Sequence, residues 1–360
     1  MSSKILIIGG GPAGLTAAIE GSKKGLNVTL CEKNEIGKNI NCAEGYFDLL
    51  NINGPPSSGV QYKVKQLIIK SAKKYYINTE NFNIWMIDRK TWQKDLLNKA
   101  VQQGVKIKEH HKISIKKFKE LQNYYDYILD GSGVPSVTSL YYGFKNNYLP
   151  DALITVQYKI KGDFSNFKNT LKVYLLKDFP GYAWIFPKSK LIANIGMGIF
   201  NKNNKKIING SQLYVHLNEF LNEHIIKGKI INKSAGICPS IILKPLRYKN
   251  IFLIGDAAGL TSPLHGGGLD LALISSKTAI KCIVQNKPQK YRELLNNTIS
   301  SKIKLEKYLK NLWLSSNKNN FEQLLTLISN MTNKRKLLRF LINHESITEL
   351  LLKKYFSLKL

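Results

Sequence analysis

Three glycines near the start of the chain have the spacing of a phosphate-binding turn. Gly9, Gly11 and Gly14 form a G-x-G-x-x-G pattern within KILIIGGGPAGLTAAIEGSKKGLNVTLCEK. Glycines at these places let the backbone approach a pyrophosphate at a helix N-terminus. Glu32 ends the next apolar run, where a carboxylate can accept a hydrogen bond from a ribose hydroxyl. Because strand, turn, helix and second strand all occur in order, the pattern predicts a dinucleotide site.

A second glycine-rich segment, GDAAGLTSPLHGGGLDLA, lies far along the chain. It resembles the G-D motif of the FAD-dependent family that includes aromatic hydroxylases. The resemblance implies that Asp256 binds the ribitol of FAD; the alternative is a turn or cap residue. It also implies helix-start amides beneath the flavin and pyrophosphate, from Gly266, Gly267, Gly268 and Leu269. The two separated motifs predict FAD, bound non-covalently, because no His or Cys lies in an obvious attachment context.

The stretch FPGYAWIFPKS places an aromatic residue at every second position: Tyr182, Trp184 and Phe186. On a strand these rings share one face, and the small Gly181 and Ala183 share the other. Two interpretations stay open. The rings pack in an ordinary core, or they line a dry slot that holds a substrate.

Three segments, in this order, resemble the geranylgeranyl reductases: CAEG at residues 42–45, PGYAWIFPK and GDAAGLTSPLHGGG. These flavoenzymes hydrogenate isolated double bonds of isoprenoid chains, including those of archaeal-type lipids. The resemblance covers roughly residues 4–285. The family's aromatic motif is P-x-x-Y-x-W-x-F-P, and here Pro180 stands one place late. By position, the resemblance implies FAD contacts for Ala13, Glu32, Cys42, Ala43, Gly45, Arg89, Asp256, Gly268 and Leu269.

The implied reaction explains why such residues are useful. Reduced flavin N5 adds a hydride to one alkene carbon, and the other carbon takes a proton, so a tertiary cation develops that water would capture. Aromatic faces exclude water and stabilise a cation by up to about 2 kcal/mol per desolvated contact. Cys42 is then a candidate catalytic proton donor or flavin-positioning group; the alternative is a small buried hydrophobe. For Arg89 the alternative to a cofactor contact is an exposed arginine in a helix's first turn.

Other activities share an FAD site. A monooxygenase or halogenase would act on an aromatic substrate, and YAWIFP lies where halogenases carry a related tryptophan motif. An electron-transfer flavoprotein would need a cysteine-rich ferredoxin tail, which this sequence lacks. A flavin-bearing binding protein on anionic membranes would show no turnover. The predicted reductase needs an isoprenoid lipid or prenyl diphosphate as substrate and NADPH, NADH or ferredoxin as external electron donor.

The residues above require an α/β fold whose nucleotide-binding part is interrupted. The parallel pattern of the first strands returns at NIFLIGDAAG, and short alternating runs from about 151 to 205 predict an antiparallel sheet. A helix in DRKTWQKDLLNKAVQQG has Asp88 as its predicted N-cap. We predict a discontinuous Rossmann-like FAD-binding domain, an inserted antiparallel substrate domain and a C-terminal helical region. The FAD-binding domain is predicted in two parts, residues 1–150 (with an excursion of the substrate domain near 52–85) and 236–286. The antiparallel substrate domain is predicted at 151–235 and the helical region at 287–360.

The chain carries a formal net charge of +30, from 54 basic and 24 acidic residues. Such a field attracts nucleotides, anionic lipid and nucleic acid. Because the lysines form no single block, we predict no specific nucleic-acid partner. Either peripheral attachment to an anionic membrane or a composition rich in Lys, Asn, Ile and Tyr explains the charge.

The cysteines, Cys31, Cys42, Cys238 and Cys282, are scattered without a C-x-x-C pair. This argues against a metal site and for a reducing compartment. No run of about 18 apolar residues predicts a membrane span. We therefore predict a cytoplasmic protein, peripheral on the cytoplasmic face of a membrane if its charge is functional.

Overall fold

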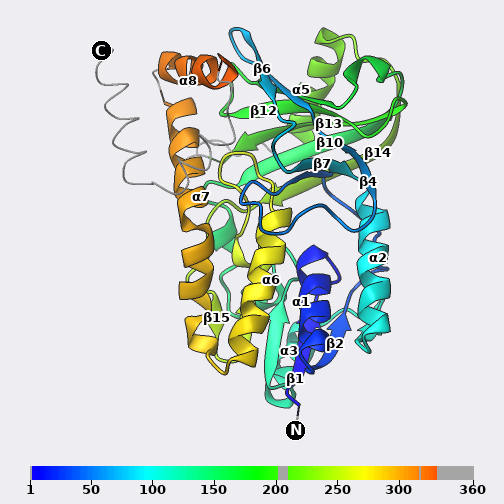
Figure 1. Cartoon of the computed structure of the whole chain (residues 1–360), viewed down its shortest axis with the longest axis vertical. Helices are drawn as coiled ribbons and strands as arrows, with labels where there is room; N and C mark the ends of the chain where they lie inside the picture. The colour runs from blue at the N-terminus through cyan, green and yellow to red at the C-terminus, as the bar shows by residue number, and fades with distance from the viewer. Residues whose placement is uncertain (1, 202–209, 316–317, 331–360) are drawn as a thin grey trace.

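The computed structural model describes residues 2–201, 210–315 and 318–330, and a six-stranded sheet forms the part that contains the N-terminus (Figure 1). The strand order is β15-β16-β9-β1-β2-β8, and all neighbours are parallel except β15 and β16. The strands are β1 (Lys4–Ile8), β2 (Asn27–Cys31), β8 (Lys106–Lys108), β9 (Tyr127–Asp130), β15 (Arg247–Tyr248) and β16 (Ile251–Leu253).

This sheet is assembled from two distant parts of the sequence. Helix α1 (Pro12–Lys23) connects β1 to β2, and its buried Ala and Leu positions pack against α6 (Leu269–Val284). After the inserted sheet, the chain returns at β15 and β16, and β16 pairs in parallel with β9. Apolar strands buried on both faces are typical of a parallel sheet covered by helices. The predicted fold class, a discontinuous Rossmann-like part with an inserted sheet, is therefore confirmed.

The inserted sheet has seven strands in the order β14-β10-β13-β12-β11-β5-β6. It is antiparallel except for the parallel pair β11–β5, so two strands from the predicted excursion extend an otherwise antiparallel sheet. Strand β12 begins directly after Pro180, so the displaced proline does not prevent it. The strands are β5 (Gln66–Lys70), β6 (Lys74–Asn78), β10 (Leu153–Lys161), β11 (Thr170–Leu175), β12 (Gly181–Pro187), β13 (Ile192–Phe200) and β14 (Lys229–Cys238).

One face of the seven-stranded sheet is covered by helix α5 (Gly210–Glu223). Leu213 and Leu217 of α5 form a buried cluster with Ala183 and Ile185 of β12. Successive side chains of a strand point to opposite faces, so the aromatic residues of β12 lie on the face away from α5.

A small three-stranded sheet, β3 (Gly45–Phe47), β7 (Ile84–Ile87) and β4 (Val60–Lys63), lies between the two larger ones. Helix α2 (Arg89–Gln102) follows β7. The predicted cap is confirmed, because the Asp88 side chain accepts a hydrogen bond of 3.0 Å from the Thr91 amide. Two shorter helices, α3 (Ile115–Tyr124) and α4 (Val137–Tyr141), complete this part of the chain.

The C-terminal region begins with α7 (Tyr291–Trp313), which runs along one side of the molecule from the six-stranded to the seven-stranded sheet (Figure 1). Helix α8 (Lys318–Asn330) follows and contacts β6. The helix predicted in KLLRFLI lies outside the described residues. Within the described ranges, none of the helices has the length and hydropathy needed to cross a membrane.

Candidate active site

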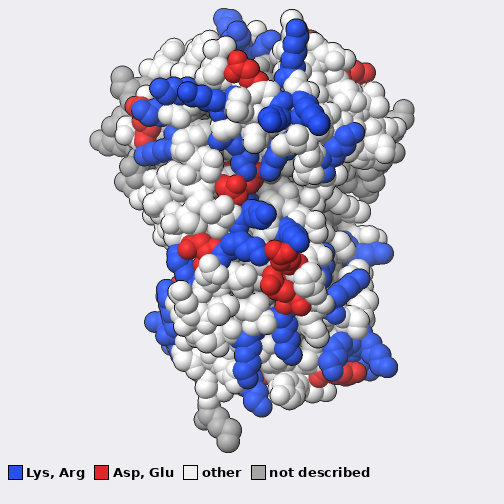
Figure 2. Space-filling view, turned by 90° about the vertical axis from the view of Figure 1, so that its right-hand side faces the viewer, with Lys and Arg blue, Asp and Glu red and all other residues white. Residues whose placement is uncertain are grey.

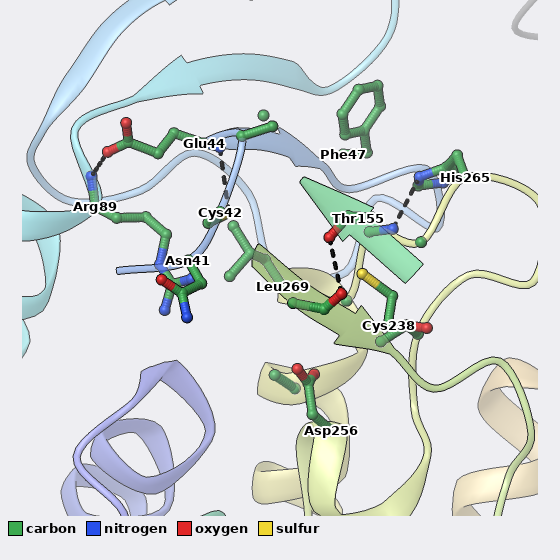
Figure 3. A pocket seen from close by; sticks show the side chains of 18 of the residues that line it. Asn41, Cys42, Glu44, Phe47, Arg89, Thr155, Cys238, Asp256, His265 and Leu269 are labelled. Atoms are coloured by element: carbon green, nitrogen blue, oxygen red, sulfur yellow. Dashed lines mark hydrogen bonds between the residues drawn. The ribbon is translucent and has the colours of Figure 1, made fainter. Parts of the chain in front are cut away.

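A pocket of about 910 Å³ is lined by the turns that follow β1, β2 and β9, by strands of the seven-stranded sheet, and by α7 and α8. Figure 3 shows some of the side chains that line it. The pocket volume lies near the upper end of the range of about 300–1,000 Å³ for small-molecule sites. All predicted site residues except Gly14 line this pocket. The predicted residues are therefore brought together, although they come from five separate stretches of the sequence.

The N-terminal glycines have different structural tasks. Gly9 has a φ of +102°, and a Cβ there would lie 2.4 Å from the Gly131 carbonyl oxygen. A Cβ on the buried Gly14 would lie 1.9 Å from the Gly9 oxygen, so Gly14 permits the turn without reaching the pocket. A Cβ on Gly11 would meet no atom within 4 Å. Gly11 therefore leaves open space at the N-terminus of α1, where an anionic group is stabilised.

The Glu32 carboxylate holds this turn from the neighbouring strand. It accepts hydrogen bonds from the amides of Gly10 at 2.7 Å and Asn34 at 2.9 Å. Glu32 also lines the pocket, together with Ala13 of α1. A carboxylate has about four acceptor positions, so the remaining ones are available to a ribose hydroxyl.

Asp256 and Arg89 face the same part of the pocket from opposite sides (Figure 3). The Asp256 side chain lies on the wall of the cavity. Enclosure by the surrounding protein raises the pKa of its carboxyl above the ordinary value, and the positive charge of Arg89 partly opposes that rise. Gln93 accepts a hydrogen bond of 2.8 Å from Arg89 Nη2. Arg89 is half-buried and lines the pocket, and its contact with the cofactor stays a prediction.

The start of α6 forms another wall. Gly266 has a φ of +67°, Gly268 precedes the first helical residue, Leu269, and all of residues 266–269 line the pocket. Open space at α1, a carboxylate at Asp256 and a second helix N-terminus fit a dinucleotide whose phosphates and hydroxyls require these partners. The residues present therefore fit FAD.

The other end of the pocket is apolar and aromatic. The Trp184 ring lies against Gly196, where a Cβ would be 2.2 Å from the ring, and it is flanked by Tyr182 and Phe186. Trp184 and Phe186 are 5% and 8% exposed and belong to a hydrophobic cluster, yet both line the pocket. Burial raises the pKa of Tyr182, whose hydroxyl donates a hydrogen bond of 2.7 Å to the His265 carbonyl. The aromatic face of β12 therefore belongs both to the hydrophobic core and to the pocket wall.

Several pocket residues were not among the predicted ones. The sequence predicted helices after Pro288 but not that they would reach a binding site. The pocket-lining residues of α7 and α8 are Leu305, Leu309, Trp313, Phe321, Leu324 and Ile328. Their helical spacing indicates an apolar face, and only the docked helices show that this face lines a cavity.

A buried ion cluster lies behind the same wall and ties α6 to α7. Lys302 Nζ is 3.1 Å from Glu306 Oε1 and 3.4 Å from Asp270 Oδ2, and His265 Nε2 is 3.7 Å from Glu306. Burial alone would lower the pKa of Lys302, but the two carboxylates outweigh it and raise that pKa. Burial, aided by the Lys302 ammonium, lowers the pKa of His265 to about 4. His265 is therefore neutral near pH 7.

Two thiols line the pocket. Cys42 Sγ accepts a hydrogen bond of 3.2 Å from the Glu44 amide, and its neighbours Ala43 and Gly45 also lie on the wall. The second thiol, Cys238, was not predicted as a site residue; burial raises its pKa. No sequence signal distinguished Cys238, because it stands at the end of an ordinary strand pattern.

Comparison with known proteins identifies two matching family models. Residues 151–238 match the geranylgeranyl reductase catalytic domain, and residues 4–75 match an FAD binding domain. The first range covers most of the seven-stranded sheet and the second the glycine turn. The resemblance expected from the sequence is therefore confirmed.

Curated relatives and solved structures agree with these models. The chain is 28% identical to the digeranylgeranylglycerophospholipid reductase of Methanococcus vannielii, over 76% of this chain and 74% of the relative. It is 26% identical to digeranylgeranylglycerophospholipid reductase 3 of Methanosphaera stadtmanae, over 91% and 90%. A geranylgeranyl bacteriochlorophyll reductase-like protein from Thermoplasma acidophilum shares the fold, with a TM-score of 0.77, 23% identity and coverage of 97% and 98%.

Proposed function

Since this chain belongs to the geranylgeranyl reductase family of FAD-dependent oxidoreductases, we propose that it hydrogenates isolated carbon–carbon double bonds of a geranylgeranyl chain on a membrane-lipid precursor. The observation that best supports this is one continuous pocket with a glycine-lined polar end and an aromatic, apolar end. Such a pocket accommodates a dinucleotide beside a long hydrocarbon. The names of the archaeal relatives support a glycerophospholipid as the molecule that carries the chain.

At the polar end, the residues hold the cofactor without a covalent bond. Gly11 admits the pyrophosphate to the N-terminus of α1, Glu32 accepts from the ribose and Asp256 from the ribitol. The amides at the start of α6 complete the site. When bound and reduced, FAD supplies a hydride to one carbon of the alkene, and an external donor (NADPH, NADH or ferredoxin) replaces its electrons.

At the apolar end, Tyr182, Trp184 and Phe186 bind the prenyl chain. They keep water from the alkene, and their ring faces stabilise the positive charge that develops on the tertiary carbon. The Cys42 thiol gives its proton to the other alkene carbon, and a proton from solvent restores the thiol. The hydride and the proton together convert the double bond into a saturated bond.

The proposal is tested by anaerobic incubation of dithionite-reduced protein with a geranylgeranyl glycerophospholipid, followed by mass spectrometry of the lipid. We expect the product to gain the mass of one hydrogen molecule for each bond reduced. Cys42→Ala should retain flavin and slow the reaction. Cys31→Ala, at a core cysteine outside the pocket, should leave the reaction rate unchanged. An unchanged lipid, or oxygen-dependent modification of an aromatic compound instead, would contradict the proposal.

A lipid substrate also requires access to a membrane, and we propose weak electrostatic attachment. Figure 2 shows lysine and arginine side chains spread over both halves of one face with fewer acidic groups. We expect the protein to sediment with anionic liposomes at low salt and to dissociate as ionic strength rises, because the Debye length falls from about 10 Å at 0.1 M to about 3 Å at 1 M. Equal binding to neutral liposomes at high salt would show that charge is not responsible.

A further inference from the structure

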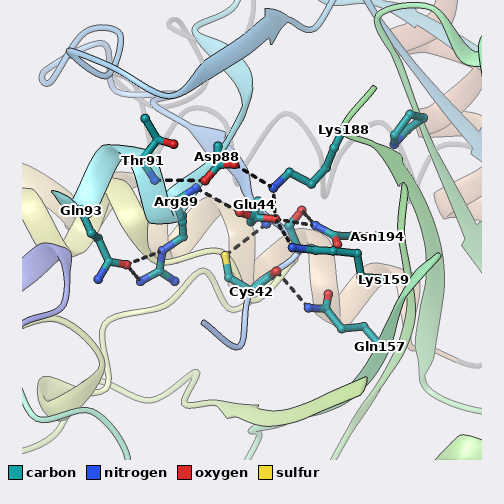
Figure 4. Close-up of polar contacts among 12 residues, drawn as sticks. Cys42, Glu44, Asp88, Arg89, Thr91, Gln93, Gln157, Lys159, Lys188 and Asn194 are labelled. Carbon is teal, nitrogen blue, oxygen red and sulfur yellow. Dashed lines mark hydrogen bonds and ion pairs between the residues drawn. The ribbon is translucent and has the colours of Figure 1, made fainter. Parts of the chain in front are cut away.

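The short turn of residues 42–45, which carries Cys42 along the pocket wall, is held by polar contacts from several parts of the fold (Figure 4). At its centre, Glu44 has a φ of +65°, in the left-handed region that costs conformational energy for any residue except glycine. Its side chain is nevertheless buried, with 3% of the residue exposed. A buried carboxylate on strained backbone persists only where its surroundings compensate.

The compensation comes from four residues in different parts of the fold. Glu44 Oε1 accepts a hydrogen bond of 3.0 Å from the Arg89 amide, the first of helix α2. Oε2 accepts one of 3.0 Å from Asn194 of β13 and lies 2.7 Å from the ammonium of Lys188, which follows β12. The Lys159 ammonium of β10 is farther away, at 3.6 Å. Charge-assisted contacts of this kind are stronger than neutral hydrogen bonds.

Two strands of the seven-stranded sheet, β10 and β13, also hold the backbone of this turn. Gln157 Nε2 donates to the Cys42 carbonyl at 2.9 Å, and Asn194 Nδ2 donates to the Ala43 carbonyl at 3.0 Å. The Glu44 amide points the other way and donates to Cys42 Sγ at 3.2 Å. The orientation of the thiol is therefore set by the conformation of Glu44, which the carboxylate contacts maintain.

From this geometry we infer that Glu44 is a positioning residue, whose clamped carboxylate places the Cys42 sulfur on the pocket wall. The inference rests on the proposed function, in which that thiol protonates the alkene. Glu44 itself acts only through Cys42. Removing its charge should leave Cys42 present but badly placed.

The test measures the Cys42 thiol directly in the flavin-bound protein. The alkylation rate of each cysteine by iodoacetamide is followed by peptide mass spectrometry in wild type, Glu44→Gln and Lys188→Met. Each substitution removes a contact that holds the Glu44 carboxylate, so the turn is released and the Cys42 sulfur becomes accessible to the reagent. We expect Cys42 to react at least about tenfold faster in both variants while the rate at Cys238, the other pocket thiol, stays unchanged. Lys188→Met leaves Glu44 in place, so it decides the outcome if Glu44→Gln does not fold.

The matched control is Glu80→Gln, which removes a carboxylate from an exposed pair with Lys65 and should change neither thiol. An unchanged Cys42 rate, or an equal rise at Cys238, would overturn the inference, because the first shows no positioning and the second only general loosening.

A double-mutant cycle provides the second readout. If Glu44 acts through Cys42, then Glu44→Gln should slow lipid reduction in wild type but cause no further loss in Cys42→Ala. Additive losses would overturn the inference. If wild type reduces no prenyl lipid, the proposed function fails, and the alkylation rates alone still decide the role of Glu44.

Discussion

Replacing Gly11 by alanine is expected to weaken FAD binding while leaving the apoprotein folded. The methyl group would meet no protein atom within 4 Å, but it would occupy the open space at the N-terminus of α1. Steric crowding of this kind costs about 1–3 kcal/mol, which is about 5- to 150-fold in affinity. The measurements are the flavin-to-protein absorbance ratio and a titration of apoprotein with FAD.

The neighbouring substitution Gly14→Ala is the matched comparison. Its methyl group would lie 1.9 Å from the Gly9 oxygen, so the backbone must shift and the turn itself should be destabilised. We expect the melting temperature of apoprotein to fall for Gly14→Ala but to change little for Gly11→Ala. At equal concentration, added FAD should raise the melting temperature of wild type more than that of Gly11→Ala. Normal flavin content in Gly11→Ala would show that the pyrophosphate does not approach α1 there.

Truncating Trp184 to alanine is expected to reduce prenyl-lipid turnover on the order of 30-fold or more. This corresponds to losing about 2 kcal/mol of cation stabilisation at one desolvated aromatic face. Because part of the ring borders the pocket, the loss of stability should be smaller than the about 3–5 kcal/mol of a core tryptophan. Flavin content should not change, since the ring lies at the apolar end.

The control for this variant is Trp85→Ala. Trp85 is 7% exposed, stacks on Tyr46 and does not line the pocket. It should therefore show the full loss of stability expected for a core residue. Denaturant unfolding of both variants, together with turnover of the geranylgeranyl lipid, separates a pocket residue from a packing residue. Equal destabilisation without a specific loss of turnover in Trp184→Ala would mean that β12 contributes only to the core.

The sequence by itself determined the features that depend on short-range geometry. The glycine turn between β1 and α1 requires particular residues because backbone atoms only a few positions apart would collide with a side chain, as Gly14 and Gly9 show. The Asp88 cap bonds an amide only three residues away. The alternation of β12 puts its three rings on one face for the same local reason. These patterns sufficed to predict a dinucleotide site and the interrupted parallel sheet, whereas FAD and the reductase family were implied by resemblance to known motifs.

The tertiary structure alone decided what surrounds those features. Whether the rings of β12 face solvent, core or a pocket depends on how α7 and α8 dock, and apolar helical spacing is compatible with all three. The clamp on Glu44 joins it to Asn194, 150 positions along the chain, and to Lys188. No local pattern encodes such a pair, because its energy arises only when the folded sheets bury both partners together. The turn that carries Cys42 is thus visible in the sequence, but its placement is a property of the fold.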